Sequence, residues 1–190
     1  MNRKADGMTE KNKDVEKILF TEEQIQEKVK EIGRRITEDY KDGNLLIVGI
    51  MKGAGIFMYD LIRQIRRPVR TDYMVLSSYG KSSVSSGTVT IKRNLDYDIS
   101  GYHIILVEDI VDTGNTMAFL KEYLSSRGAL SVKICSMLDK PARRIKPVVI
   151  DYCGFEVEDE FIVGYGCDYA EQYRYLPYFG ILKKEIYLKD

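Results

Sequence analysis

Histidine is nearly absent from this sequence, which contains a single one, His103, among 190 residues. A histidine-based catalytic triad needs that side chain beside a nucleophile and an acid, and zinc sites use several histidines or cysteines. His103 lies within GYHIILVED, residues 101–109, an apolar segment typical of a strand. We therefore expect a structural or surface role for His103, and its isolation excludes a metal site built from several histidines.

Cysteine is scarce as well. Cys135, Cys153 and Cys167 are odd in number, and no pair of them has the C-x-x-C spacing that would indicate zinc. All three lie in or beside apolar, strand-like segments, so we expect small, buried, reduced thiols.

The sequence has no excess of charge and no long apolar run. Lysine plus arginine and aspartate plus glutamate both total 29, so nothing attracts the whole chain to nucleic acid or to an anionic membrane. No segment is long and apolar enough for a membrane helix, and residues 1–14 lack the apolar core of a secretory signal. We predict a cytoplasmic protein with neither nucleic-acid nor membrane partners.

The length and the 44% hydrophobic content fit one globular domain. Residues 1–14 are charged and show no periodicity, so we expect a disordered N-terminal extension. Residues 15–190 are expected to form the single domain.

A helix is predicted to begin at Thr21, where Gln24 completes a capping box. It should end near residues 41–43. The apolar residues that follow the cap at spacings of four, three and four are Ile25, Val29, Ile32 and Ile36. They form one stripe that should pack on a sheet.

Strand-like and helical segments then alternate along the chain. The strand-like segments are residues 44–51, 71–79, 88–93, 102–107, 130–138, 148–155 and 161–165, and the helical ones are residues 57–65 and 116–127. This order predicts an α/β fold with a mostly parallel sheet. Residues 80–87 are polar and small, which favours a flexible loop.

The most informative segment is VEDIVDTGNT, residues 107–116, where a predicted strand ends and a helix begins. Open α/β sheets bind ligands at that edge. Gly114 permits a tight turn, so the amides of the loop can point into one volume at the helix N-terminus, where an anion is favoured. Thr113 and Thr116 add hydroxyl donors, and together these groups predict a site for a monophosphate.

Two adjacent carboxylates, Glu108 and Asp109, precede that site. Their repulsion from a phosphate would be costly unless they met hydroxyl groups or a divalent cation. A ribose with Mg²⁺ bound to it supplies both, and Mg²⁺ is often held mainly by its substrate. The third acid of the segment is Asp112.

This segment resembles the phosphoribosyl pyrophosphate signature of type I phosphoribosyltransferases. The resemblance extends over about residues 20–187 and is strongest to the hypoxanthine-guanine branch. It implies a mostly parallel central sheet flanked by helices, a small hood built from both ends of the chain, and a flexible lid loop. It also implies a purine salvage enzyme that uses Mg²⁺ and transfers phosphoribosyl from phosphoribosyl pyrophosphate to hypoxanthine or guanine. The products would be IMP or GMP and pyrophosphate.

The resemblance assigns roles to the signature residues. Glu108 and Asp109 would hold the ribose hydroxyls and the metal, and Asp112 would act on purine N7 as the general base. The residues that would hold the 5′-phosphate are Asp112, Thr113, Gly114, Asn115 and Thr116.

Three further segments match the parts of the family site that meet pyrophosphate. Met51-Lys52-Gly53-Ala54-Gly55 is similar to the pyrophosphate loop, in which the peptide before the glycine is often cis. Ser78 and Tyr79 resemble the Ser-Tyr pair of the lid, which would keep water from the reacting sugar. Arg174 matches an arginine that contacts pyrophosphate.

The purine contacts implied by the resemblance come from the C-terminal third of the chain. Lys140 would meet the 6-oxo group, which favours oxopurines over adenine. Phe161 would stack on the base, Ile162 would contact its edge, and Asp168 would help to hold a second Mg²⁺. The basic patch in residues 143–146 is interpreted as a solvated loop.

Other functions stay open at this stage. A relative that prefers xanthine would differ only in contacts around the 2-position of the base. A nucleotide-binding RNA regulator of the same fold would need a basic face, which zero net charge disfavours. A simple nucleotide-binding or interaction module would leave Asp112 without a task. The family resemblance also implies a homodimer or homotetramer.

Overall fold

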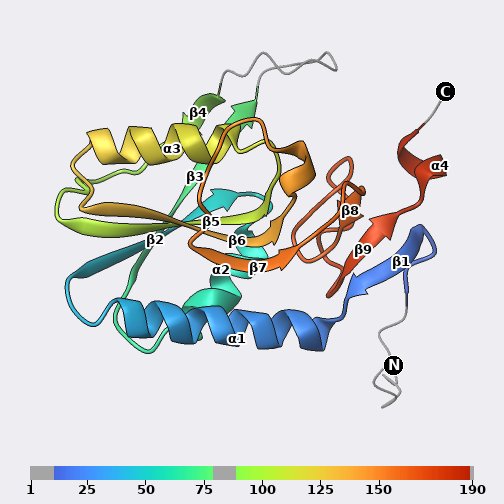
Figure 1. The fold of residues 1–190 in the computed structure, drawn as a ribbon, viewed down its shortest axis with the longest axis horizontal. Helices are drawn as coiled ribbons and strands as arrows, with labels where there is room; N and C mark the ends of the chain where they lie inside the picture. The colour runs from blue at the N-terminus through green and yellow to red at the C-terminus, as the bar shows by residue number, and fades with distance from the viewer. Residues whose placement is uncertain (1–10, 79–88, 189–190) are drawn as a thin grey trace.

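The computed structural model describes residues 11–78 and 89–188 (Figure 1). None of its helices is long and apolar enough to span a membrane. The elements in chain order are β1 (Val15–Phe20), α1 (Glu22–Asp39), β2 (Asn44–Met51), α2 (Gly55–Ile62), β3 (Arg70–Ser78), β4 (Val89–Arg93), β5 (Tyr102–Val111), α3 (Asn115–Ser126), β6 (Ser131–Asp139), the 3-10 helix η1 (Pro141–Arg143), β7 (Tyr152–Glu156), β8 (Ile162–Val163), β9 (Phe179–Leu182) and α4 (Lys184–Tyr187).

The larger sheet has the strand order β4-β3-β2-β5-β6-β7. All neighbouring strands in it are parallel except β3 and β4, which are antiparallel. Helices α1 and α2 cover one face and α3 covers the other (Figure 1). Ile47 of β2 packs in the cluster under α1 and α2, whereas its neighbours Leu46 and Val48 pack in the cluster under α3. The prediction of an α/β fold with a mostly parallel sheet is confirmed, and β2 is buried on both faces.

Helix α1 begins as the sequence predicts. The Gln24 backbone nitrogen donates to Thr21 Oγ1 at 3.4 Å, and the Thr21 backbone nitrogen donates to Gln24 Oε1 at 2.9 Å. These reciprocal bonds satisfy backbone donors that the first turn leaves without helical partners. The predicted stripe is fully buried: Ile25, Val29, Ile32 and Ile36 all have 0% exposure.

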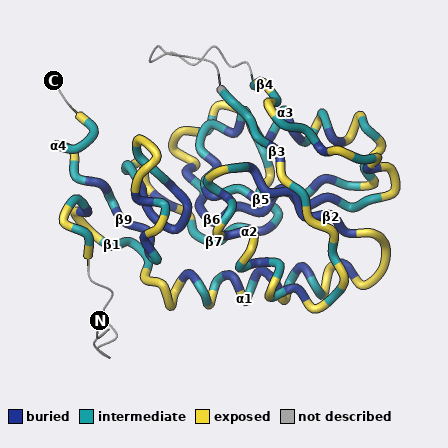
Figure 2. Tube along the Cα trace, turned by 180° about the vertical axis from the view of Figure 1, so that it is seen from behind, coloured by how far each residue is buried: buried dark blue, intermediate teal, exposed yellow. Residues whose placement is uncertain are grey.

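A second, smaller sheet forms the hood, with the order β1-β9-β8 and antiparallel pairing. It lies beside the carboxyl ends of the parallel strands of the larger sheet (Figure 1) and has its own buried cluster (Figure 2). The predicted N-terminal extension is too long: residues 1–10 lie outside the described part, but Asn12 and Asp14 belong to the hood. The Asn12 nitrogen donates to the Tyr178 hydroxyl at 2.7 Å, and the Asp14 carbonyl accepts from the Lys183 nitrogen at 3.0 Å.

Three further predicted boundaries differ from the structure. The strand predicted over 148–155 starts only at Tyr152, because the preceding residues follow Pro147 and do not pair with β6 along their length. The strand predicted over 161–165 ends at Val163, because Gly164 and Tyr165 have positive φ values of 97° and 38° that turn the chain. Helix α2 stops at Ile62 rather than near residue 65.

The single histidine and the three cysteines have structural surroundings, as the sequence predicts. His103 Nδ1 lies 2.8 Å from Ser131 Oγ, at the start of β5 and β6. The three thiols are free; Cys135 and Cys167 are buried, whereas Cys153 is only partly buried. Burial raises the pKa of the Cys135 thiol well above its usual range, so it stays protonated.

Replacing Thr21 with alanine tests the cap. Because the change removes the side-chain acceptor for the Gln24 nitrogen, we expect the free energy of unfolding to fall by about 1 kcal/mol. Urea unfolding followed by circular dichroism measures it. Thr21→Ser keeps the hydroxyl and serves as the matched control, expected to lie close to wild type. Equal stability of Thr21→Ala and wild type would show that the capping box does not stabilise the domain.

Candidate active site

The proposed phosphate site lies where β5 passes into α3. Strand β5 continues to Val111, four residues past its predicted end, so Glu108 and Asp109 stand inside the strand. Gly114 has a left-handed φ of 80°, and a Cβ there would lie 2.4 Å from the Lys146 carbonyl oxygen. Both features require glycine at the turn.

The loop encloses a hollow of about 100 Å³. Gly114 is the N-cap of α3 and has no side chain to cap the helix, and the Asn115 backbone nitrogen donates to Thr113 Oγ1 at 3.4 Å. The amides that follow in the first turn can donate to an anion at the helix N-terminus. Asn115 is not among the residues that form the hollow. Its lining consists of Glu108, Ile110, Val111, Asp112, Thr113, Gly114, Thr116 and Met117.

A second hollow, of about 230 Å³, adjoins the first through Asp112. Lys140 lines it, is only 6% exposed, and donates from Nζ to the Glu160 carbonyl at 2.7 Å. Phe161 reaches the hollow from a stack on Tyr187, with ring centroids 4.7 Å apart. The complete lining is Asp109, Ile110, Asp112, Lys140, Arg143, Phe161, Ile162, Cys167 and Asp168. The residues predicted to contact a purine therefore meet in one place.

A third hollow, of about 410 Å³, opens on the other side of Glu108 and Asp109. The predicted Lys52, Gly53 and Arg174 line it together with Asp168 and Thr116. The Met51-Lys52 peptide is cis, as the resemblance implies.

The cations of the third hollow are paired with acids from one C-terminal turn. Lys52 Nζ lies 2.8 Å from Glu171 Oε2, and Arg174 Nη2 lies 2.7 Å from Asp168 Oδ1. Arg174 also donates to the Gly166 carbonyl at 2.6 Å, which fixes its guanidinium against the backbone. Because each pair brings opposite charges together, an anion entering here would exchange a protein carboxylate for its own oxygens.

Two carboxylate oxygens are buried without a hydrogen-bond partner among the described residues, Glu108 Oε2 and Asp112 Oδ1. Buried polar groups usually find partners, so Glu108 Oε2 marks a place for a ligand. Asp112 Oδ1 instead faces a cation, with Arg143 Nε 3.4 Å away. Burial, reinforced by the neighbouring Asp109 carboxylate, raises the pKa of Glu108 well above its usual range. Burial, reinforced by Asp109, also raises the pKa of the Cys167 thiol, which makes this lining residue a poor nucleophile.

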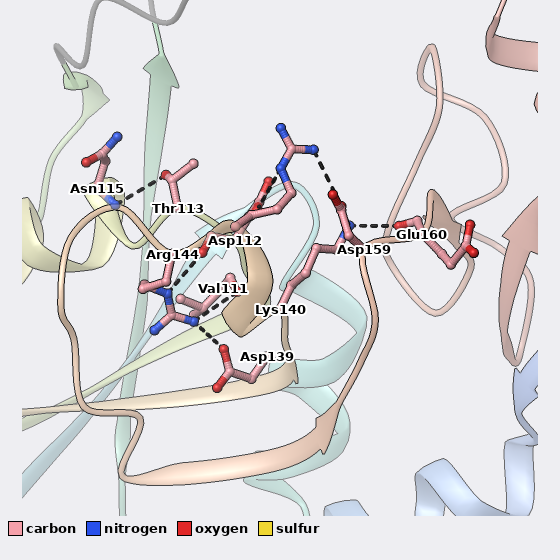
Figure 3. Close-up of polar contacts among 10 residues, drawn as sticks. Val111, Asp112, Thr113, Asn115, Asp139, Lys140, Arg144, Asp159 and Glu160 are labelled. Atoms are coloured by element: carbon pink, nitrogen blue, oxygen red, sulfur yellow. Dashed lines mark hydrogen bonds and ion pairs between the residues drawn. The ribbon is translucent and has the colours of Figure 1, made fainter.

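The basic patch at 143–146 is not the solvated loop that the sequence predicts. Arg144 has a side chain only 17% exposed; it pairs with Asp139 and donates to the carbonyls of Asp112, at 3.0 Å, and Val111, at 3.3 Å (Figure 3). The nitrogens of Ile145 and Lys146 both donate to the Thr113 carbonyl at 2.9 Å. This segment supports the loop of residues 112–114 through backbone contacts and is not merely solvated.

The lid prediction falls largely outside the described residues. Ser78 ends β3 and pairs with Val89 of β4, which places the start of the proposed lid next to the third hollow. Tyr79 and residues 80–87 lie outside the described part of the chain.

Comparison with known proteins identifies relatives of this chain. It is 49% identical to the hypoxanthine-guanine phosphoribosyltransferase of Bacillus subtilis, over 92% of this chain and 97% of that protein. It is also 46% identical to the bifunctional protein TilS/HprT of Listeria innocua, over 97% of this chain, but it spans only 28% of that protein's length.

Solved structures give the same result. A hypoxanthine phosphoribosyltransferase from Staphylococcus aureus matches with a TM-score of 0.89 and 43% identity, over 93% of this chain and 96% of that one. The Trypanosoma cruzi hypoxanthine phosphoribosyltransferase in complex with the product IMP matches with a TM-score of 0.88 and 36% identity, over 94% and 100%. The family model of the phosphoribosyl transferase domain matches residues 17–170. With most of its length covered by this model and by relatives of such identity, the chain belongs to the phosphoribosyl transferase family.

Proposed function

We propose that this chain is a purine salvage enzyme that transfers the phosphoribosyl group of phosphoribosyl pyrophosphate to hypoxanthine or guanine. The products are IMP or GMP and pyrophosphate. The observation that supports this proposal most strongly is that three hollows meet around Glu108, Asp109 and Asp112. The Lys140 ammonium group lies beside the second of these hollows. The family match and the names of the relatives support the same activity.

The phosphate of the substrate would bind the loop from Asp112 to Thr116, where amides and hydroxyls donate to it. This placement would leave the ribose hydroxyls facing Glu108 and Asp109. The purine would lie in the second hollow against Phe161 and Ile162. Reacting atoms held in this way gain most of their acceleration from orientation and electrostatic stabilisation.

Asp112 is the proposed general base. As N9 of the purine bonds to C1′ and pyrophosphate leaves, the proton on N7 would pass to the Asp112 carboxylate. Its position between the phosphate hollow and the purine hollow allows contact with a base joined to the bound sugar. No covalent bond between protein and sugar is required.

Lys140 is the proposed determinant of oxopurine selectivity. Its ammonium has three donors and no acceptor, so it matches the 6-oxo group of hypoxanthine or guanine and not the 6-amino group of adenine. The Glu160 carbonyl, 2.7 Å away, holds it in place. Xanthine has the same 6-oxo group, so a xanthine-preferring enzyme is the competing proposal.

The residues present fit a Mg²⁺ ion that is held mainly by substrate oxygens. Among residues 11–78 and 89–188 no cluster of three or more acidic, histidine or cysteine side chains could hold a metal, so Glu108, Asp109 and Asp168 form no closed site. Glu108 Oε2 is nevertheless a buried oxygen without a partner beside the ribose position. Glu108 and Asp109 would hold Mg²⁺ on the ribose side and Asp168 on the pyrophosphate side. When bound, the ion would neutralise the charge of pyrophosphate.

Lys52, the backbone of Gly53 and Arg174 are the proposed pyrophosphate contacts. Ser78 and Tyr79 are proposed to begin the lid that excludes water. We further propose that the enzyme works in the cytoplasm as a homodimer or homotetramer, whose size analytical ultracentrifugation would measure.

Asp112→Asn tests the base. An amide cannot accept the N7 proton, so we expect kcat with hypoxanthine and with guanine to fall by roughly a hundredfold or more. Absorbance assays with phosphoribosyl pyrophosphate, Mg²⁺ and hypoxanthine, guanine, xanthine, adenine or uracil measure it. Asp42→Asn, an exposed change after α1, is the matched control.

The same assay separates the alternatives. Preferred turnover of xanthine would support the competing enzyme. Binding of phosphoribosyl pyrophosphate without turnover of any base would refute the proposed activity and favour a regulatory protein. Full activity of Asp112→Asn would remove this residue from the mechanism.

Lys140→Met tests base selection. The change keeps the length of the side chain and removes the charged donor, so kcat/KM for hypoxanthine should fall about tenfold to a hundredfold. The preference for hypoxanthine over adenine should fall with it. Lys30→Met on the exposed face of α1 is the control. An unchanged preference would assign selectivity to another residue.

Chelation tests the metal. We expect excess EDTA to abolish turnover and added Mg²⁺ to restore it. Because Glu108→Gln and Asp109→Asn each remove a carboxylate on the ribose side, both should raise the Mg²⁺ concentration needed for half-maximal rate. Undiminished turnover in EDTA would rule out a metal requirement.

A further inference from the structure

The purine hollow contains one charged side chain that the proposed mechanism does not use, that of Arg143. Arg143 ends the 3-10 helix η1, and Lys140 immediately precedes that helix. Side chains at positions i and i+3 lie one above the other in a 3-10 helix. The turn therefore places both cations on the same side, where they line the hollow together with Asp112.

Within the described part of the chain, Arg143 is the side chain that faces the buried oxygen of the Asp112 carboxylate. The main-chain carbonyl of Asp112 is fixed by Arg144 Nε at 3.0 Å, but Asp112 Oδ1 accepts no hydrogen bond within the described part of the chain. The cation facing Oδ1 is the Arg143 guanidinium, whose Nε lies 3.4 Å away. Arg144 thus holds the backbone of the proposed base, and Arg143 lies beside its carboxylate.

Arg143 is itself linked to the other purine-side residue. Its Nη1 lies 3.9 Å from Asp159 Oδ1, and the same oxygen lies 3.6 Å from Lys140 Nζ (Figure 3). A row of alternating charges, Asp112, Arg143, Asp159 and Lys140, therefore joins the proposed base to the proposed oxo-group donor. A guanidinium suits the middle of such a row because its planar donors face two carboxylates at once.

The exposure of these side chains indicates that the row orients charged groups and contributes little to the stability of the fold. The side chains of Arg143 and Asp159 are 52% and 55% exposed, and exposed ion pairs contribute little to folding. Losing Arg143 should consequently leave the fold intact while freeing the Asp112 carboxylate to rotate away from the base.

We propose that Arg143 is a positioning residue that orients the Asp112 carboxylate toward N7 of the purine, with Asp159 holding Arg143 in place. The proposal rests on the proposed role of Asp112. One carboxylate oxygen faces the guanidinium, and the other is left for the N7 proton.

A double-mutant cycle of Arg143→Ala and Asp112→Asn tests this inference. We expect Arg143→Ala to lower kcat about tenfold or more, with KM for phosphoribosyl pyrophosphate unchanged. If Arg143 acts through Asp112, adding Arg143→Ala to Asp112→Asn should change kcat less than twofold. Arg34→Ala, which breaks an exposed pair on α1, is the control and should match wild type.

Two further variants and one additive sharpen the test. Arg143→Lys keeps the charge but lacks the planar guanidinium that can face two carboxylates, so it should retain only part of the rate. Asp159→Asn should lower kcat less than Arg143→Ala does. Guanidinium ion at low millimolar concentration should partly restore Arg143→Ala but not change Arg34→Ala. Circular dichroism of every variant checks the fold.

Wild-type rates in both Arg143→Ala and Arg143→Lys would overturn the inference. So would an equal loss of kcat in the wild-type and Asp112→Asn backgrounds, or a change confined to KM for the purine, which would indicate direct contact with the base. Absence of turnover by the wild-type enzyme would refute the proposed function, and the inference with it.

Discussion

The active-site edge depends on how closely separate backbone segments approach one another. A Cβ on Gly53 would lie 1.9 Å from Asp109 Oδ2, and a Cβ on Gly166 would lie 2.2 Å from the Gly53 carbonyl oxygen. Nonbonded Cβ contacts shorter than 3.0 Å are essentially never seen, so a side chain at position 166 would have to move the Gly53 backbone, and one at position 53 would displace the Asp109 carboxylate. These close approaches bring the end of β5, the loop after β2 and the turn after β8 to one place. The carboxylate of Asp109 can therefore border both the second hollow and the third hollow.

Charge at this edge is balanced locally, in agreement with the zero net charge of the chain. The cations of the third hollow already face carboxylates of the turn after β8, and the first hollow gains its positive potential from backbone amides. Such an arrangement attracts an anion by exchange of partners instead of through a broad basic surface. The buried Glu108 oxygen adds a place where a cation carried by that anion would be favoured.

The sequence predicted those parts whose signals are local. The stripe and cap of α1, the strand β2 and the strand-to-helix turn at Gly114 all depend on residues close in the chain. It did not predict β1 and β9, because short strands at opposite ends of the chain acquire their identity only by pairing with each other. The role of Arg144 was missed for the same reason, because its contacts with the Val111 and Asp112 carbonyls join residues more than 30 positions apart.

Arg143 and Arg144 show why composition alone misjudges such a segment. Both belong to one basic run, yet one side chain is 52% exposed and the other 17%. In a helix with three residues per turn, adjacent side chains point about 120° apart. Pro141 starts such a turn two residues after the end of β6. Arg143 therefore lines the second hollow, whereas Arg144 contacts the backbone of the loop before α3. The 3-10 turn thus separates support of the main chain from orientation of the carboxylate, although a single residue, Asp112, receives both.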